Sequence, residues 1–207
     1  MKVTVIGSGN MASGLVKQFA QAGHQVQIHA LDQAQAEALA AANGARVVNA
    51  ADAKSAEVIL VATYYANAVE ALRALGDLTG KVVIDITNPL TADFMGLTIG
   101  HSTSAAEEIA KALPGARIVK AFNTVFAQRL AAGAKLAGET IPVFVASDDA
   151  EAKATVTALV ASTGFTPIDA GPLKNARYLE PLGGLNIYFG YGAGLGTAIA
   201  PAWIKKA

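Results

Sequence analysis

The chain has 207 residues, of which 53% are hydrophobic, so it is long enough and apolar enough to bury a sizeable core. It contains no cysteine, which excludes disulfides, thiolate zinc sites, iron–sulfur clusters and a cysteine nucleophile. Sixteen basic and sixteen acidic side chains cancel, so the net charge does not favour nucleic acid or a membrane surface as a partner.

The first predicted element is a strand at residues 2–6, inside the opening sequence MKVTVIGSG. This opening has one Lys and a short apolar run that breaks into glycine, which is not the pattern of a signal peptide. No later apolar run approaches the roughly 20 residues that a membrane-spanning helix needs. We therefore expect a cytoplasmic protein without a membrane partner.

Strand and helix patterns then alternate along the chain. After its first residue, Glu57, the segment EVILVAT is a continuous apolar run up to Ala62, which is typical of a strand buried on both faces. Met11, Leu15 and Phe19 recur at a spacing of four, which indicates one face of a helix. The predicted strands are 2–6, 24–30, 45–48, 57–63, 81–87, 116–122, 141–147 and 166–171, and the predicted helices are 11–22, 33–42, 65–75 and 105–113.

Two capping patterns mark further helix starts. Ser104 and Glu107 form the S-x-x-E capping box in front of the helix at 105–113. Asp148 with Glu151 is predicted to cap the helix that follows the next strand.

Repeated strand–helix units predict the fold class, because they build a parallel sheet with helices on both faces. We expect an α/β, Rossmann-type doubly wound, mainly parallel sheet. Near residue 171 the alternation stops, and the rest of the chain is helical or looped with many glycines. The predicted organisation is a dinucleotide-binding domain at 1–170 and a small helical, glycine-rich C-terminal segment at 171–207, within one compact unit.

The turn between the first strand and the first helix carries the dinucleotide fingerprint G-x-G-x-x-A, at Gly7, Gly9 and Ala12. Gly7 permits the sharp turn, Gly9 lets the backbone approach a pyrophosphate, and Ala12 lets the helix pack closely on the strand. The helix start then offers unpaired N–H groups and its positive dipole end to the phosphates. The alternative is a tight turn without a ligand.

The end of the second strand should read the adenosine ribose, and here it reads His29, Ala30, Leu31 and Asp32. An acidic residue at this point hydrogen-bonds a free 2′-hydroxyl and repels a 2′-phosphate. Asp32 fits that role or, equally well, caps the next helix. His29 either touches the adenosine or only ends the strand.

Four segments occur in the order typical of one known family: IGSGNMASGL, DITNPL, IVKAFNT and DAGPLKNARYLE. The chain resembles the deazaflavin-dependent NADP oxidoreductases, whose founding members pass hydride between NADPH and coenzyme F(420). The resemblance covers nearly the whole chain, and KAFNT with DAGPL–NAR is its more specific part, since pyrroline-5-carboxylate reductases share the GNM motif.

The resemblance implies a Rossmann domain, a small C-terminal part over the nicotinamide, and a set of site residues. The pyrophosphate is expected at Ser8, Gly9, Asn10 and Met11, beside Gly7. The implied neighbours of the rest of the dinucleotide are Ala62, Thr63, Tyr64, Asn88, Pro89, Ala121, Phe122 and Asn123. The second-substrate pocket is expected at Gly171, Pro172 and Leu173.

This chain departs from the family at two positions. Ala30 and Leu31 stand where the family carries Ser-Arg for the 2′-phosphate, and Thr63 stands where it carries Pro. The cofactor is therefore expected to be NADP or NAD, with coenzyme F(420) or a flavin as the second substrate.

Hydride transfer between two ring systems needs stacking and exclusion of water more than an acid or a base. The sequence predicts no catalytic acid or base, and its three histidines form no metal-binding motif, so no metal is expected. The predicted function is an NAD(P)-dependent oxidoreductase that acts on a small-molecule redox substrate, and the alternative is a dinucleotide-binding regulatory module without turnover. The glycine-rich end, with Trp203, favours a homodimer that buries part of residues 175–207.

Overall fold

The computed structural model describes residues 1–203, and its centre is a six-stranded sheet in which every pair is parallel. The strand order is β3-β2-β1-β4-β5-β6, the doubly wound order with one reversal between β1 and β4. The predicted Rossmann-type fold class is confirmed. The strands are β1 (Lys2–Ile6), β2 (Gln25–His29), β3 (Arg46–Val47), β4 (Val58–Val61), β5 (Val82–Asp85) and β6 (Arg117–Lys120).

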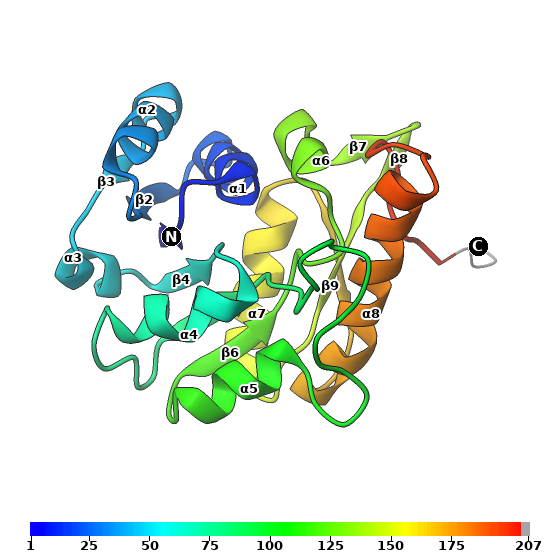
Figure 1. Cartoon of the computed structure of the whole chain (residues 1–207). Helices are drawn as coiled ribbons and strands as arrows, with labels where there is room; N and C mark the ends of the chain where they lie inside the picture. The colour runs from blue at the N-terminus through cyan, green and yellow to red at the C-terminus, as the bar shows by residue number, and fades with distance from the viewer. Residues whose placement is uncertain (204–207) are drawn as a thin grey trace.

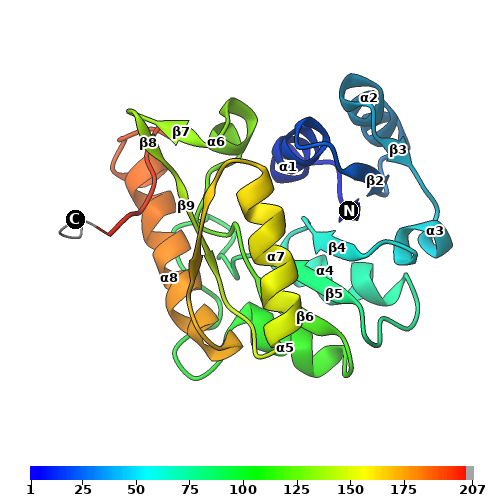
Figure 2. The ribbon, with the colours of Figure 1, turned by 180° about the vertical axis from the view of Figure 1, so that it is seen from behind.

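Helices cover both faces of this sheet, because its strands are apolar on both sides. Along β4, Val58 and Leu60 join the core on one face, and Ile59 and Val61 join the core on the other. Figure 1 shows α4 and α5 in front of the sheet, and Figure 2 shows α7 on the opposite face. One layer contains α1 (Asn10–Gln21), α2 (Gln33–Asn43) and α7 (Ala150–Ser162), and the other contains α3 (Ala50–Lys54), α4 (Tyr65–Arg73) and α5 (Ala105–Ala112).

The chain after β6 leaves the parallel sheet. A short helix α6 (Ala127–Ala132) and a hairpin of β7 (Lys135–Leu136) and β8 (Glu139–Thr140) lead to β9 (Pro142–Val145). Strand β9 pairs in parallel with β10 (Thr166–Asp169), and one antiparallel bridge, Lys120 to Ala146, joins this pair to β6. The last two predicted strands therefore exist but form a separate two-stranded sheet.

The C-terminal segment is a helical arm that lies alongside β9 (Figure 1). A 3-10 turn (Leu173–Asn175) leads into α8 (Ala176–Ile187), which ends in a π-helical turn (Tyr188–Gly192). The tail then folds back, and Trp203 packs edge-on against Phe144 with ring centroids 5.2 Å apart. The predicted extension runs on to residue 207, but residues 204–207 lie outside the described part. No described helix is long and apolar enough to cross a membrane.

One predicted cap is confirmed and one is shifted. The Ser104 hydroxyl accepts the N–H of Glu107 at 3.2 Å and caps α5. Helix α7 is capped by Asp149, whose carboxylate accepts the N–H of Ala152 at 2.8 Å. The prediction of Asp148 as the cap was wrong by one residue, because helix periodicity fixes a helix start only within a residue or two.

Candidate functional site

The order of the parallel strands reverses between β1 and β4, so their carboxyl ends form a topological switch point. In doubly wound folds this topological switch point is where ligands bind. The turn between β1 and α1, Gly7 to Gly9, lies at this edge. The fingerprint glycines are therefore placed at the switch point.

Gly7 occupies a position that excludes every other residue. Its φ is +114°, and a Cβ there would lie 2.7 Å from the backbone oxygen of Ala62, just beyond β4. Its N–H donates to the backbone oxygen of His29 at the end of β2, at 2.9 Å. The turn is thus fixed between the two strands that flank β1.

Gly9 differs, because its backbone is extended (φ −71°, ψ −173°) and a Cβ there would meet no atom within 4 Å. It is the N-cap of α1, but no side chain caps this helix and its first turn has no acidic residue. Ser8 donates its hydroxyl to Gln35 at 2.8 Å, whereas Asn10 is exposed and Met11 is half-buried. The start of α1 therefore presents free N–H groups and a positive dipole end to open space.

The four candidate residues at the end of β2 differ in their contacts and in their exposure. The imidazole Nδ1 of His29 lies 3.0 Å from the backbone oxygen of Val48, and Ala30 is 9% exposed. Leu31 is fully exposed. Asp32 accepts the N–H of Gln35 at 2.9 Å and caps α2. The capping interpretation of Asp32 is confirmed, while a contact with ribose stays a prediction.

The segment after β4 lies on the other side of the switch point. Ala62 faces Gly7, and the Thr63 hydroxyl donates to the backbone oxygen of Tyr64 at 3.1 Å. The Tyr64 ring is exposed and lies 6.4 Å, centroid to centroid, from the ring of Phe94. Two aromatic rings therefore stand at the carboxyl end of β4.

The segments after β5 and β6 are joined by a pair of amides. Asn88 donates to the backbone oxygen of Asn123 at 2.9 Å, and the Asn123 amide donates back to the Asn88 side-chain oxygen at 2.9 Å. The Asn123 amide also donates to the backbone oxygen of Leu179 in α8, at 2.8 Å. A Cβ at Gly183 of α8 would lie 2.8 Å from the Asn88 side chain. These four residues bring α8 against the ends of the two strands.

The other predicted residues of these segments are mainly buried. Pro89 and Ala121 are buried, and Phe122 is 1% exposed with a left-handed backbone, φ +61°. The Phe122 ring packs edge-on against Phe19 and Phe165 in the core. The Phe122 ring is therefore not available to a ligand at the sheet edge.

A buried ionic cluster, which sequence reasoning missed, lies just behind these amides. Lys120 is fully buried, and its ammonium lies 2.8 Å from Asp85 and 2.8 Å from Glu180. It also donates to the backbone oxygen of Thr87. Burial alone would lower the pKa of Lys120, but the two carboxylates outweigh it and raise the pKa, whereas burial raises the pKa of Glu180. The sequence did contain a signal for this cluster: Asp85 and Lys120 are each the single charged residue in an otherwise apolar run, VVIDI and IVKAF.

Glu180 also serves the start of α5. Its carboxylate accepts the N–H groups of Ala105 and Ala106 at 2.8 and 3.2 Å. The cluster has one cation and two carboxylates, so the helix N-terminus offsets part of its extra negative charge.

Gly171, Pro172 and Leu173 lie apart from the residues described so far. The Gly171 oxygen accepts the N–H of Ser147, and the Leu173 N–H donates to Asp148, both just beyond β9. Because β9 runs antiparallel to β6, this part of β9 lies toward the amino end of β6. No described contact joins Gly171–Leu173 to the glycine turn, and their substrate role stays a prediction.

Three comparisons with known proteins agree with this geometry. The model of a family described as NADP oxidoreductase, coenzyme F(420)-dependent, matches residues 2–89. The F(420)-dependent NADP reductase of Methanothermobacter thermautotrophicus is 30% identical, in an alignment that covers 88% of this chain and 86% of the relative. The crystal structure of a putative F(420)-dependent NADP-reductase from Arthrobacter sp. fb24 is 31% identical, has a TM-score of 0.83, and covers 96% of both chains.

A second group of relatives is longer. Metalloreductase STEAP3 of Rattus norvegicus is 30% identical over 181 residues, which cover 87% of this chain but 36% of that protein. The chain therefore spans about a third of the length of this metalloreductase.

Proposed function

Because the chain belongs to the coenzyme F(420)-dependent NADP oxidoreductase family, we propose that it transfers hydride between a nicotinamide dinucleotide and a flavin-like or deazaflavin acceptor. The observation that carries this proposal is the glycine turn at the switch point. Gly7 fits only as glycine, Gly9 faces open space, and the uncapped α1 begins there. These residues fit a pyrophosphate, which needs free N–H groups and no side chain in the way.

The dinucleotide lies across the switch point in this proposal. Its pyrophosphate is held by Ser8, Gly9, Asn10 and Met11, and its adenosine ribose lies near the His29–Leu31 segment. No Arg or Lys occurs between His29 and Gln35. Discrimination in favour of a 2′-phosphate is therefore weak, and the cofactor is NADP or NAD.

The nicotinamide half lies over the carboxyl ends of β4, β5 and β6. Its neighbours are Ala62 to Tyr64, Asn88 with Pro89, and the segment from Ala121 to Asn123. When bound, the nicotinamide supplies the hydride. The protein orients the ring and excludes water, and the exposed rings of Tyr64 and Phe94 offer an aromatic rim on which a flat acceptor stacks.

Isothermal titration with NADPH, NADP, NADH and NAD tests the cofactor site directly. A screen of flavin and deazaflavin acceptors with the dinucleotide that binds best then tests turnover. The second candidate function is a regulatory module that binds the dinucleotide without turnover. The segments at the nicotinamide end favour the enzyme, because a sensor needs only the adenosine half.

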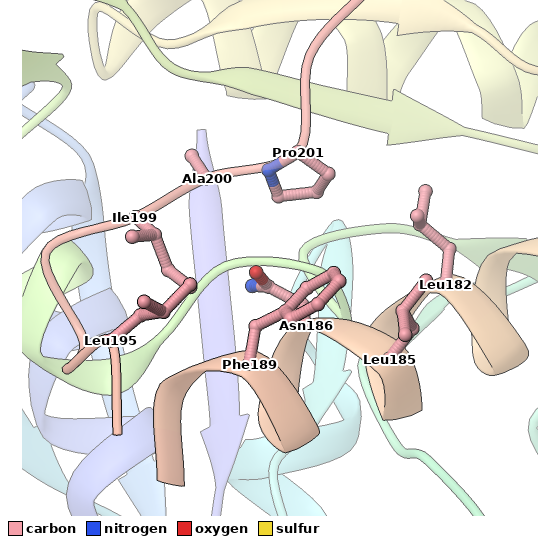
Figure 3. A pocket seen from close by; sticks show the side chains of 8 residues that line it. All are labelled: Leu182, Leu185, Asn186, Phe189, Leu195, Ile199, Ala200 and Pro201. Atoms are coloured by element: carbon pink, nitrogen blue, oxygen red, sulfur yellow. The ribbon is translucent and has the colours of Figure 1, made fainter. Parts of the chain in front are cut away.

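We also propose that the protein is a cytoplasmic homodimer whose contact surface includes α8 and the tail. The exposed apolar side chains there are Leu185, Tyr188, Phe189, Tyr191, Leu195 and Trp203. Beside them is an apolar pocket of about 270 Å³ between α8 and the tail, lined by Leu182, Leu185, Asn186, Phe189, Leu195, Ile199, Ala200 and Pro201 (Figure 3). Apolar surface of this extent is typical of an interface. Sedimentation equilibrium tests the dimer, and a monomer at high micromolar concentration contradicts it.

A further inference from the structure

The buried cluster around Lys120 connects three segments that are far apart in the sequence. Lys120 ends β6, Asp85 ends β5, and Glu180 lies in α8. All three side chains are at most 1% exposed, and the ammonium lies 2.8 Å from each carboxylate. The ammonium also bonds the Thr87 oxygen, so it holds the segment after β5 as well as the strand itself. A buried Lys with three partners fixes the relative position of the elements that carry them.

The amide pair lies three residues beyond Asp85 in one segment and three residues beyond Lys120 in the other. Asn88 and Asn123 bond each other, and Asn123 also donates to Leu179. The side-chain oxygen of Asn123 is buried without a hydrogen-bond partner in the described part of the chain. Its orientation therefore depends on its NH₂ group alone, and so on where Asn88 and Leu179 are held.

These contacts close into a ring. Lys120 bonds Thr87, whose neighbour Asn88 reaches the segment after β6. That segment bonds Leu179, whose neighbour Glu180 returns to Lys120. In the ring, α8 meets the ends of β5 and β6 so closely that position 183 has no room for a Cβ. Displacing any one of the three segments breaks contacts in the other two.

We propose that Lys120 is a positioning residue: through Asp85, Thr87 and Glu180 it registers α8 with the ends of β5 and β6, and so fixes the Asn88–Asn123 wall against which the nicotinamide half of the cofactor is oriented. This inference rests on the proposed function. The ring is proposed to orient only the nicotinamide half of the cofactor. The adenosine half lies over α1 and β2, which the ring does not touch.

The test separates the two halves of the cofactor. The affinity for NADPH is compared with the affinity for ADP-ribose, which keeps the adenosine and pyrophosphate but lacks the nicotinamide. The main variant is the double substitution Lys120→Met and Glu180→Gln. It removes one cation and one anion together, so the net charge of the cluster is unchanged, and the Gln oxygen can still accept an N–H from α5.

The matched control is Arg177→Gln. It removes an ion pair between α8 and α5, Arg177 to Glu107 at 2.6 Å, and leaves every contact of the ring in place. We expect the double variant to lose about tenfold in NADPH affinity, with ADP-ribose affinity within about twofold of the wild type. We expect the control to change neither affinity by more than about twofold.

One result overturns the inference: a folded double variant with the wild-type ratio of the two affinities, whether both affinities are unchanged or both fall equally. If the double variant does not fold, Gly183→Ala decides by the same ratio, because it displaces the Asn88–Asn123 pair without changing any charge. Failure of the proposed function has its own signature: the wild type binds neither NADPH nor NADH, which overturns this inference as well.

Discussion

Replacing Gly9 by Val separates the phosphate site from the stability of the fold. The backbone at Gly9 is extended, which any residue adopts, and a Cβ there meets nothing within 4 Å. The remaining cost is that of a poor N-cap, about 1 kcal/mol. For a chain of this size a loss of that order lowers the Tm by roughly 2–4 °C. The variant is therefore expected to fold.

The same substitution is expected to remove dinucleotide binding. The valine side chain occupies the space in front of α1 where the pyrophosphate lies in our proposal. Each charge-assisted hydrogen bond from an N–H to a phosphate contributes about 1.5–3 kcal/mol. Losing two of them costs about 3–6 kcal/mol, which weakens binding by roughly 10²- to 10⁴-fold.

Isothermal titration with NADPH and NADH measures the loss, and calorimetric melting confirms that the variant is folded. Gly100→Val is the matched control, because Gly100 also has open space around it and no positive φ, but lies in the loop before α5. The control is expected to bind like the wild type. A folded Gly9→Val protein with wild-type affinity would refute the placement of the phosphates on α1.

Three further outcomes are expected. Leu31→Arg adds a cation at a fully exposed position, and should strengthen NADPH binding roughly tenfold or more while NADH binding changes little; a wild type that already prefers NADPH a hundredfold contradicts this. Gly7→Ala forces a Cβ to 2.7 Å from a backbone oxygen, whereas Gly23, the control position, has a positive φ but open space around it. In urea unfolding, Gly7→Ala should lower the free energy of unfolding by about 1–3 kcal/mol more than Gly23→Ala does. Equal losses argue against the close approach. Asp149→Asn keeps the cap of α7 but loses the charge that the Arg117 hydrogen bonds stabilise, which lower the pKa of Asp149 to about 2. Because the folded pKa is depressed, the Tm gap between wild type and variant should be full above about pH 4 and should close toward pH 2; the same gap at pH 3 as at pH 7 refutes it.

The main sheet was predictable because its strands are buried on both faces. Continuous apolar runs such as residues 58–61, separated by helices with apolar residues at a spacing of four, leave few topologies besides a doubly wound sheet. The glycine turn was predictable for the same reason, since a strand and a helix flank it at fixed distances. Local pattern and global fold agree in this part of the chain.

The path of the chain after β6 was not predictable from periodicity. Strand β9 has the composition of any buried strand, and nothing in its residues shows that it runs antiparallel to β6. That arrangement depends on the short α6 and the β7–β8 hairpin, which are too short to give a clear pattern. Both were missing from the predicted elements.

The buried cluster shows the same limit at the candidate site. Lys120 meets Asp85 from 35 residues away and Glu180 from 60 residues away. Each charge alone suggests an exposed or strand-terminal side chain, and only the packing of α8 against the sheet reveals that the three form one buried cluster. The Phe122 ring was likewise assigned to the site with its neighbours, but its left-handed backbone turns it into the core.

The most direct test of hydride transfer is a single-turnover experiment with NADPH deuterated at the transferable position of the nicotinamide. The wild type is mixed with oxidised deazaflavin or flavin acceptors, and the product is analysed for deuterium by mass spectrometry. The proposed function predicts that one acceptor class is reduced at the rate at which the nicotinamide absorbance falls, and that deuteration slows this rate. A reduced deazaflavin also keeps the label on carbon C5, whereas a reduced flavin loses it from nitrogen N5 to water. Tight NADPH binding with no loss of absorbance and no labelled product for any acceptor would contradict it and identify a binding module instead.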